Sequence, residues 1–306
     1  MLLWEISFGV TLHTQPVNPC ATGCTVGPVM TFVQGASLSC ADGRFGGLSG
    51  LSVTADGSLL TSISDRGGNF VSLPSRDYSG AQLTFGKFRS GDAEGLTVSR
   101  NASASYVSYE RGGGTDRYAG VLDRRVGSVS SLGSVAAGAD CGSGNGQYEA
   151  LELLNDSTLL AICESNGVGR IVDLDSGNVL RRLQYPMPSS IPLQPTDAAR
   201  LSGGRGLLVL ERYWAGSHAP WGRQTNIRIR HVSEHALWSS TSSETSIEPR
   251  LLLELNAYEH EADNFEGLAI HETGAGGARV WLISDNNFNS NNQRTHVRTS
   301  SNASRH

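Results

Sequence analysis

Residues that could bind a metal ion or act on an ester recur along the chain in one repeated pattern. Five short segments each place a carboxylate or a hydroxyl before a small residue and then an apolar one. The key residues are Ser49, Glu94, Glu149, Asp197 and Glu266, in segments 47–51, 92–96, 148–151, 195–199 and 264–268. Similarity that returns every few tens of residues is typical of propellers and repeat arrays.

A second set of acids follows the first. Each repeated segment is followed by an apolar run that ends in an acid, and these acids are Asp65, Glu110, Glu164, Glu211 and Asp285. Turn-forming residues such as Gly57 and Gly204 lie between the two acids of a unit. Two strand-like runs around a turn make an antiparallel hairpin, in which the first residue of one strand lies beside the last residue of the other. We therefore expect both acids of each unit at one end of its hairpin.

The elements that must position these residues are short strands. Further strand-like runs follow each hairpin, for example 118–122 and 170–174. Each unit then has about four short strands, which is the content of one propeller blade. The sequence therefore predicts an all-β fold, a β-propeller of four-stranded antiparallel blades, with five blades favoured and six possible.

The repeat also predicts the domain organisation. The propeller domain is expected over residues 46–299. The N-terminal segment 1–45 is expected to supply a closing strand for the last blade, through 4–12 or 29–33, or else to build a sixth blade. Residues 300–306 are expected to form a disordered tail.

The first set of acids indicates a metal site on the propeller axis. The innermost strand of each blade lines the central channel, so the five key residues should converge at one mouth. Carboxylates that crowd together raise one another's pKa unless a cation compensates. Oxygen ligands without His or Cys suit a hard ion, and the variable spacing favours Ca²⁺ over Mg²⁺. The alternative is that these acids accept backbone N–H groups where blades meet.

The second set of acids lies beside arginines and suggests a place for a substrate. Three of these acids are followed at once by Arg66, Arg111 and Arg212. The mixed charges either form ion pairs between blades or hold an anionic ester while an acid or water does the chemistry. The candidate catalytic residues are Asp65, Glu110 and Glu211. The candidate substrate-binding residues are Arg66, Arg111, Arg212, Asp285 and Asn286.

Composition and charge limit the partners. The formal charge of −5 gives no general attraction to nucleic acid or to an anionic membrane, so neither is expected as a partner. We expect a monomer that takes a small anionic phosphoester.

The apolar start of the chain carries Glu5 and lacks a basic region, so it is a poor signal peptide, and the cellular compartment of the protein stays open. Of the five cysteines, Cys20, Cys24 and Cys40 could pair outside the cytosol.

Several of these motifs together resemble the phytase-like family described as "esterase-like activity of phytase". The resemblance covers roughly residues 45–298. It is carried by residues 45–51, 64–67, 94–96, 110–111, 195–197, 208–212, 264–268 and 282–289. It implies a propeller with many acidic residues, a phosphoester hydrolase activity and an exported, secreted or periplasmic protein. The set of Ser, Glu, Glu, Asp and Glu is also similar to the central calcium site of five-bladed calcium-dependent nucleotidases.

The chain departs from the family pattern at three places. Ala150 replaces the usual glycine after Glu149, Ser165 replaces the arginine after the second acid, and residues 294–298 are polar where the family tends to be apolar.

The leading hypothesis for the function is a phytase-like, calcium-dependent phosphoric ester hydrolase. One alternative is a noncatalytic, calcium-stabilised propeller that binds a ligand or protein. Another is a lactonase or other carboxylic ester hydrolase on the same scaffold.

Overall fold

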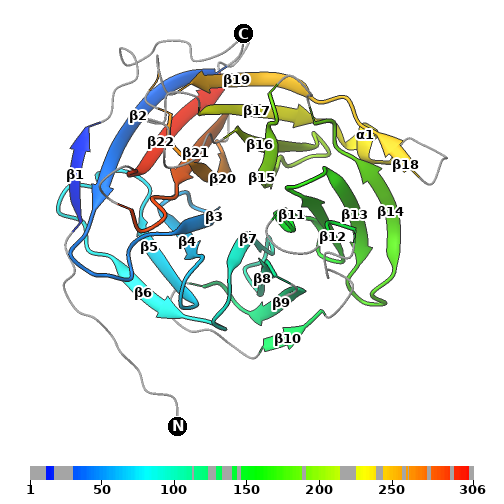
Figure 1. Ribbon diagram of the computed structural model, residues 1–306, viewed down its shortest axis with the longest axis horizontal. Helices are drawn as coiled ribbons and strands as arrows, with labels where there is room; N and C mark the ends of the chain where they lie inside the picture. The colour runs from blue at the N-terminus through cyan, green and yellow to red at the C-terminus, as the bar shows by residue number, and fades with distance from the viewer. Residues whose placement is uncertain are drawn as a thin grey trace.

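The computed structural model shows five β-sheet blades arranged in a ring (Figure 1). It describes residues 12–16, 30–111, 114–122, 129–132, 140–142, 146–187, 191–213, 225–238, 244–256, 260, 262–273, 277–289 and 293–302. The prediction of an all-β propeller with five blades is confirmed. Among the described residues, no helix has the length and apolar character needed to cross a membrane.

Each blade runs outward from an innermost strand at the axis, with neighbouring strands antiparallel. Blade 1 comprises β3 (Leu48–Val53), β4 (Leu59–Ser64), β5 (Asn69–Pro74) and β6 (Thr84–Lys87). Blade 2 comprises β7 (Ala93–Val98), β8 (Ala104–Tyr109), β9 (Gly114–Ala119) and β10 (Val129–Ser131). Blade 3 comprises β11 (Tyr148–Asn155), β12 (Thr158–Cys163), β13 (Val168–Asp173) and β14 (Val179–Gln184). Blade 4 comprises β15 (Gln194–Arg200), β16 (Leu207–Tyr213), β17 (Asn226–Val232) and β19 (Arg250–Asn256).

Blade 5 joins the two ends of the chain. It comprises β20 (Phe265–Glu272), β21 (Ala278–Ser284), β22 (Thr295–Asn302) and, from the N-terminal segment, β2 (Met30–Ser39). The register between β2 and β22 runs from Met30 opposite Asn302 to Leu38 opposite Thr295. In Figure 1 the blue β2 lies along the red β22. A ring closed in this way has no open edge at the junction of its first and last blades.

Three elements extend this basic plan. β1 (His13–Pro16) pairs with β2 on the outside of blade 5, and β18 (Glu244–Ser246) pairs in parallel with β14 of blade 3. The short helix α1 (Glu234–Trp238) follows β17. β22 continues to Asn302, so the tail expected from residue 300 is strand over 300–302, and 303–306 lie outside the described residues.

Apolar side chains fill the spaces between neighbouring blades. Between blades 4 and 5, for example, Leu210 and Ile229 pack in one cluster with Phe265 and Leu282. Successive side chains on a strand point to opposite faces of the sheet, so a blade with neighbours on both sides needs apolar residues on both faces. This requirement explains the apolar runs that precede each second acid.

The residue after the key acid is small because innermost strands approach each other closely. A Cβ on Gly50 would lie 2.8 Å from the backbone nitrogen of Leu96 and 2.9 Å from the carbonyl oxygen of Glu94. A Cβ on Gly95 would lie 2.8 Å from the Cβ of Leu151. The repeated glycine therefore allows β3, β7 and β11 to pack tightly around the axis.

Asp197 on β15 ties innermost strands together across the axis. Its Oδ2 accepts hydrogen bonds from the backbone N–H of Leu51 on β3, at 3.3 Å, and of Leu268 on β20, at 2.6 Å. Its Oδ1 accepts the N–H of Ala198 at 2.8 Å. The side chain is fully buried. Since blade 5 separates blades 1 and 4 in the ring, Asp197 connects strands that do not pair with each other.

We expect Asp197→Ala to destabilise the propeller strongly. The change leaves three backbone N–H groups without their acceptor, and each such loss costs about 1–3 kcal/mol, so the free energy of unfolding should fall by about 3 kcal/mol or more. Asp197→Asn keeps one acceptor oxygen and should cost less. Urea denaturation measures both changes, with Asp175→Ala on an exposed turn as the control. An Asp197→Ala variant as stable as this control would contradict the proposed connection.

Candidate functional site

The first residues of the innermost strands bring carboxylates together at one mouth of the ring. Burial raises the pKa of Glu94 and Glu149, and the charge of Glu266 nearby raises both further. Ser49 donates from Oγ to Glu266 Oε2 at 2.7 Å. The structure therefore places Ser49, Glu94, Glu149 and Glu266, four of the five residues predicted to converge, in one group.

The second set of acids extends this group. Glu110 accepts hydrogen bonds on Oε1 from the backbone N–H of Gly146 and, at 3.2 Å, of Gln147. Asp285 accepts the N–H of Asn287 at 2.7 Å. We call the whole set the carboxylate cluster. It consists of Asp65, Asp92, Glu94, Glu110, Glu149, Glu164, Glu266 and Asp285.

Arg212 is a buried counter-ion inside the carboxylate cluster. Its guanidinium pairs with Glu164, at 2.6 Å, and with Glu266, and donates to Asn264 Oδ1 at 2.7 Å. Only 11% of its side chain is exposed. These contacts direct the guanidinium to protein partners, so Arg212 holds two carboxylates in place, and its predicted contact with a substrate stays a prediction.

Arg66 and Arg111 differ from Arg212 because they lie on the rim of the mouth. Their side chains are 63% and 66% exposed, respectively. Arg66 lies 4.0 Å from Asp65 and stacks over the ring of Phe288 at 4.8 Å. Arg111 pairs with Asp92 at 3.1 Å. Exposed ion pairs of this kind contribute little to stability, so both guanidinium groups can turn toward an anionic ligand at small cost.

The carboxylate cluster carries more negative charge than its surroundings neutralise. Burial raises the pKa of Glu149 and Asp285 well above the ordinary value, and like charges nearby raise each further. The pKa of Glu266 is also raised by burial, although Arg212 opposes the shift. A group of buried carboxylates with one buried arginine is stabilised either by protonation or by a bound cation.

The spacing of the oxygen atoms fits a metal ion. Two groups, Asp92 with Glu94 and Glu110, and Glu110 with Glu149 and Glu164, each offer three oxygens within 4.8 Å of one another. Oxygens that share one Ca²⁺ at about 2.3–2.6 Å cannot lie more than about 5 Å apart. Both groups meet this limit, and their donors are all hard carboxylate oxygens. The carboxylate cluster can therefore hold a metal ion.

Asp65 has the protonation behaviour of an acid or base catalyst. Burial is the main cause that raises its pKa to about 7, Glu266 and Asp92 raise it further, and Arg66 opposes the shift. Its Oδ1 is buried and accepts no hydrogen bond from the described residues. A carboxyl group that titrates near neutral pH can take a proton from a reacting molecule.

Two predicted residues lie elsewhere. Asp197 accepts backbone N–H groups across the axis, which is the alternative that the sequence left open, so its oxygens are not available to a metal. Glu211 lies at the expected end of its hairpin, but it is completely buried, accepts from the Tyr185 hydroxyl at 2.6 Å and lies 3.4 Å from Arg230. Neighbouring residues on a strand point to opposite faces of its sheet. Glu211 therefore points into the interface between two blades, whereas Arg212 points toward the carboxylate cluster. Glu211 thus contacts Tyr185 and Arg230 and lies apart from the carboxylate cluster, and its catalytic role stays a prediction.

Asn286 shapes the mouth from within the protein. Its Oδ1 accepts the backbone N–H of Phe288 at 3.0 Å and of Gly47 at 3.3 Å. These bonds hold the loop after β21 against the start of blade 1. Phe288, the ring beneath Arg66, is fixed by the same loop.

Sequence reasoning missed Asp92 and Asn264 as site residues. Each lies two positions before a key acid, Glu94 or Glu266, just ahead of β7 or β20, where the strand pairing has an irregularity. The recurrence of a polar residue two positions before the acid was the signal that could have pointed to them. Asp92 belongs to a potential metal group, and Asn264 Nδ2 donates to Glu266 Oε1 at 2.8 Å.

A disulfide supports the same mouth and was also missed. Cys141 bonds to Cys163, the residue before Glu164. The loop that follows Cys141 supplies the backbone N–H of Gly146 to Glu110. Of the three cysteines considered for pairing, Cys40 has a free thiol, and Cys20 and Cys24 lie outside the described residues.

Comparison with solved structures finds matches at low sequence identity. Glutaminyl cyclase from Myxococcus xanthus matches with a TM-score of 0.53 and 11% identity, over 91% of this chain and 99% of that one. Hydrazine synthase from Kuenenia stuttgartiensis has a TM-score of 0.43 and 14% identity, over 79% of this chain and 57% of that one. A luciferin-regenerating enzyme has a TM-score of 0.44 and 13% identity, over 84% of this chain and 92% of that one. The likeness to glutaminyl cyclase shows the fold alone.

Comparison by sequence identifies the family. A search of curated proteins finds no match. The sequence model of the phytase-like family, described as "esterase-like activity of phytase", matches residues 43–288. The match begins before β3 and ends after β21, so it includes the repeated acidic segments of all five blades. The chain therefore belongs to the phytase-like family of esterase-like β-propellers.

Proposed function

We propose that this protein is a calcium-dependent hydrolase of phosphoric esters, with its active site in the carboxylate cluster. Family membership supports an esterase-like enzyme. The observation that carries the finer proposal is the pair of three-carboxylate groups that share Glu110, beside two exposed arginines on the rim. Acids spaced for a hard cation and guanidinium groups above them suit a phosphate ester.

Two groups that share Glu110 could each hold a calcium ion. One is Asp92, Glu94 and Glu110, and the other is Glu110, Glu149 and Glu164. When bound, calcium supplies positive charge that polarises the phosphate group. Gly146 and Gln147 donate to Glu110 and fix one of its oxygens, so that the other is free to act as a ligand. Arg212 holds Glu164 and Glu266 in place and reduces the repulsion among the acids.

The rim residues would bind and activate the substrate. Arg66 and Arg111 donate to phosphate oxygens, since guanidinium groups match phosphate geometry. Asp65, in its ionised form, takes a proton from the attacking water, whose oxygen forms the new bond to phosphorus. The ester P–O bond then breaks, and Asp65 returns the proton to the departing alcohol oxygen. Phosphate and an alcohol are the products.

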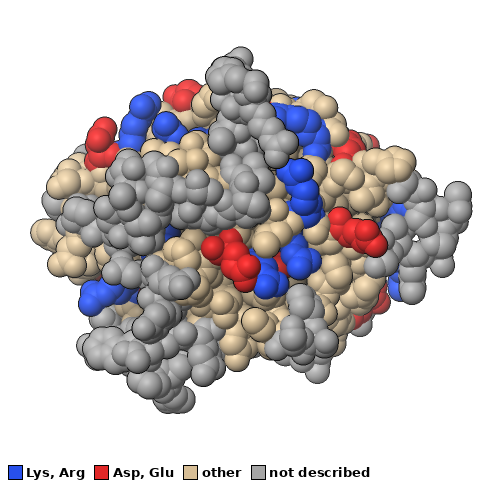
Figure 2. Space-filling model, turned by 90° about the horizontal axis from the view of Figure 1, so that it is seen from above, with Lys and Arg blue, Asp and Glu red and all other residues tan. Residues whose placement is uncertain are grey.

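The partners in this proposal are small molecules. Figure 2 shows basic and acidic side chains mixed among the described residues of one face. The formal charge of −5 gives no general attraction to nucleic acid or to an anionic membrane, and the proposed protein acts as a monomer on a small anionic ester. A noncatalytic ligand-binding propeller and a carboxylic ester hydrolase are the competing functions that the experiments below distinguish.

Hydrolysis should depend on calcium and on Glu94. With a panel of phosphomonoesters and phosphodiesters, chelation should abolish activity, and added Ca²⁺ should restore it. We expect Glu94→Gln to lower activity about 10–100-fold because it removes one charged ligand, and Glu248→Gln on an exposed loop to leave it unchanged. Activity that survives both chelation and Glu94→Gln would contradict the proposal. Turnover of lactones alone would favour the carboxylic ester hydrolase.

The pH profile should report Asp65. The ionised carboxylate accepts the proton, and the pKa of Asp65 is about 7 without calcium. Activity should therefore rise with pH as Asp65 ionises, at or below about pH 7, since a bound cation favours the ionised form. Asp65→Asn cannot accept a proton, so we expect a loss of about 10²–10⁴-fold and no ionisation near pH 7 in the residual activity. An Asp65→Asn variant with the wild-type pH profile would assign the base to another group.

Stability should also change with pH and calcium. The raised pKa values mean that the folded, metal-free protein binds more protons than the unfolded chain between about pH 4 and pH 7, so its stability falls as pH rises through this range. Calorimetry should show a higher Tm at pH 5 than at pH 8. Calcium at about one hundred times its Kd should add about 2.7 kcal/mol at pH 8, and less at pH 5. A calcium effect that is equal at both pH values would contradict binding by these carboxylates.

A further inference from the structure

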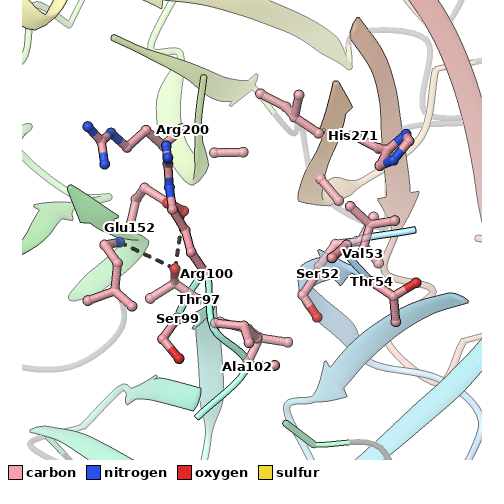
Figure 3. A pocket seen from close by; sticks show the side chains of 18 of the residues that line it. Ser52, Val53, Thr54, Thr97, Ser99, Arg100, Ala102, Glu152, Arg200 and His271 are labelled. Carbon is pink, nitrogen blue, oxygen red and sulfur yellow. Dashed lines mark hydrogen bonds between the residues drawn. The ribbon is translucent and has the colours of Figure 1, made fainter. Parts of the chain in front are cut away.

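A cavity of about 490 Å³ opens at the other mouth of the ring, away from the carboxylate cluster. All five innermost strands begin at the carboxylate cluster, and this cavity is lined where they end and by the turns that follow (Figure 3). Its volume is within the range of small-molecule sites, about 300–1,000 Å³. We call it the far cavity. The tight approach of the innermost strands, together with Asp197, lies between the two mouths.

One wall of the far cavity carries hydrogen-bond donors. Figure 3 shows Glu152, Thr97, Arg100 and Arg200 on this wall. Thr97 donates from Oγ1 to Glu152 Oε2 at 3.2 Å. Burial raises the pKa of Glu152 to about 8, even though Arg200 and Arg100 both favour its ionised form. At neutral pH the carboxyl group is therefore mostly protonated and can itself donate a hydrogen bond.

Among the charged residues on this wall, Arg100 is the one that could pair with a ligand. Arg200 lies 3.5 Å from Glu234, which offsets its charge. Arg100 is in the exposed turn after β7 and forms no ion pair with a carboxylate among the described residues. Glu272, also in the lining, is already bonded to Ser202 and Arg205. Asp156, an exposed carboxylate, also lines the cavity, so the wall is close to neutral overall and Arg100 itself would hold a ligand's single negative charge.

The opposite wall is mixed in character. Ser52, Val53, Thr54 and His271 lie across the cavity from Arg100 (Figure 3). Val53 and Ile270 add partly exposed apolar surface to the lining. A ligand that fills the far cavity thus meets charge on one side and apolar side chains on the other.

We propose that the far cavity binds a small monocarboxylic acid with an apolar body. Its carboxylate would lie between Arg100 and the Glu152 carboxyl group, and its body against Val53 and Ile270. A protonated carboxyl group and a guanidinium together give a carboxylate two charge-assisted hydrogen bonds. This site is separate from the ester-hydrolysing mouth and does not depend on calcium.

Ligand-observed NMR titrations with hexanoate and phenylacetate test the proposal on the full chain. Wild-type protein should bind both acids. Arg100→Gln should weaken binding about tenfold, since it removes one charged hydrogen bond worth about 1.5–3 kcal/mol. Arg250→Gln, on the exposed outer strand β19, is the matched control and should bind as wild type does. Hexanamide, which has no charge, should bind about tenfold more weakly than hexanoate.

Three results would overturn the proposal. One is the failure of wild-type protein to bind either acid, and another is equal binding of hexanoate by wild type and Arg100→Gln. The third is binding of hexanamide as tight as that of hexanoate. Glu94→Gln separates the two mouths: it should leave hexanoate binding unchanged, whereas its loss in this variant would place the acid at the carboxylate cluster.

Discussion

Repulsion among carboxylates at one end of a closed ring is the interaction on which the rest of this structure depends. The fold brings the carboxylates together, because the innermost strands all begin at the same mouth and three of them, β7, β11 and β20, place a glutamate there. Arg212 neutralises part of the charge, and the backbone N–H groups of Gly146 and Gln147 stabilise Glu110. The negative charge that these contacts do not neutralise is the physical basis for a bound cation.

The repeated segment of acid, small residue and apolar residue serves three purposes at once. The acid faces the mouth, the small residue allows neighbouring innermost strands to approach, and the apolar residue packs between blades. Blade 4 uses the same segment differently, because Asp197 reaches the N–H groups of Leu51 and Leu268 and stabilises the ring itself. One motif thus provides both the site and part of its support. The disulfide between Cys141 and Cys163 adds support from the loop side.

The repeat made the five-bladed fold and the convergence of Glu94, Glu149 and Glu266 predictable, because hairpin geometry fixes which end of a blade each acid occupies. It could not separate Asp197 from these three, since that difference depends on which N–H groups the opposite strands present. Nor could it decide that Glu211 faces Tyr185 while Arg212 faces the axis. The far cavity carries no motif at all, because unrelated residues from strand ends and turns, such as Glu152 and Arg100, meet there only in the folded ring.

The two mouths therefore differ in chemistry: one gathers carboxylates, and the other places a protonated carboxyl beside arginines. The central claim, that the carboxylate cluster shares a cation, is tested most directly by a crystal structure of the protein grown with calcium, using anomalous scattering to locate the ion. The account predicts calcium about 2.3–2.6 Å from oxygens of one of the two groups, either Asp92, Glu94 and Glu110 or Glu110, Glu149 and Glu164. Calcium bound elsewhere, with these carboxylates contacting only protein groups, would contradict it.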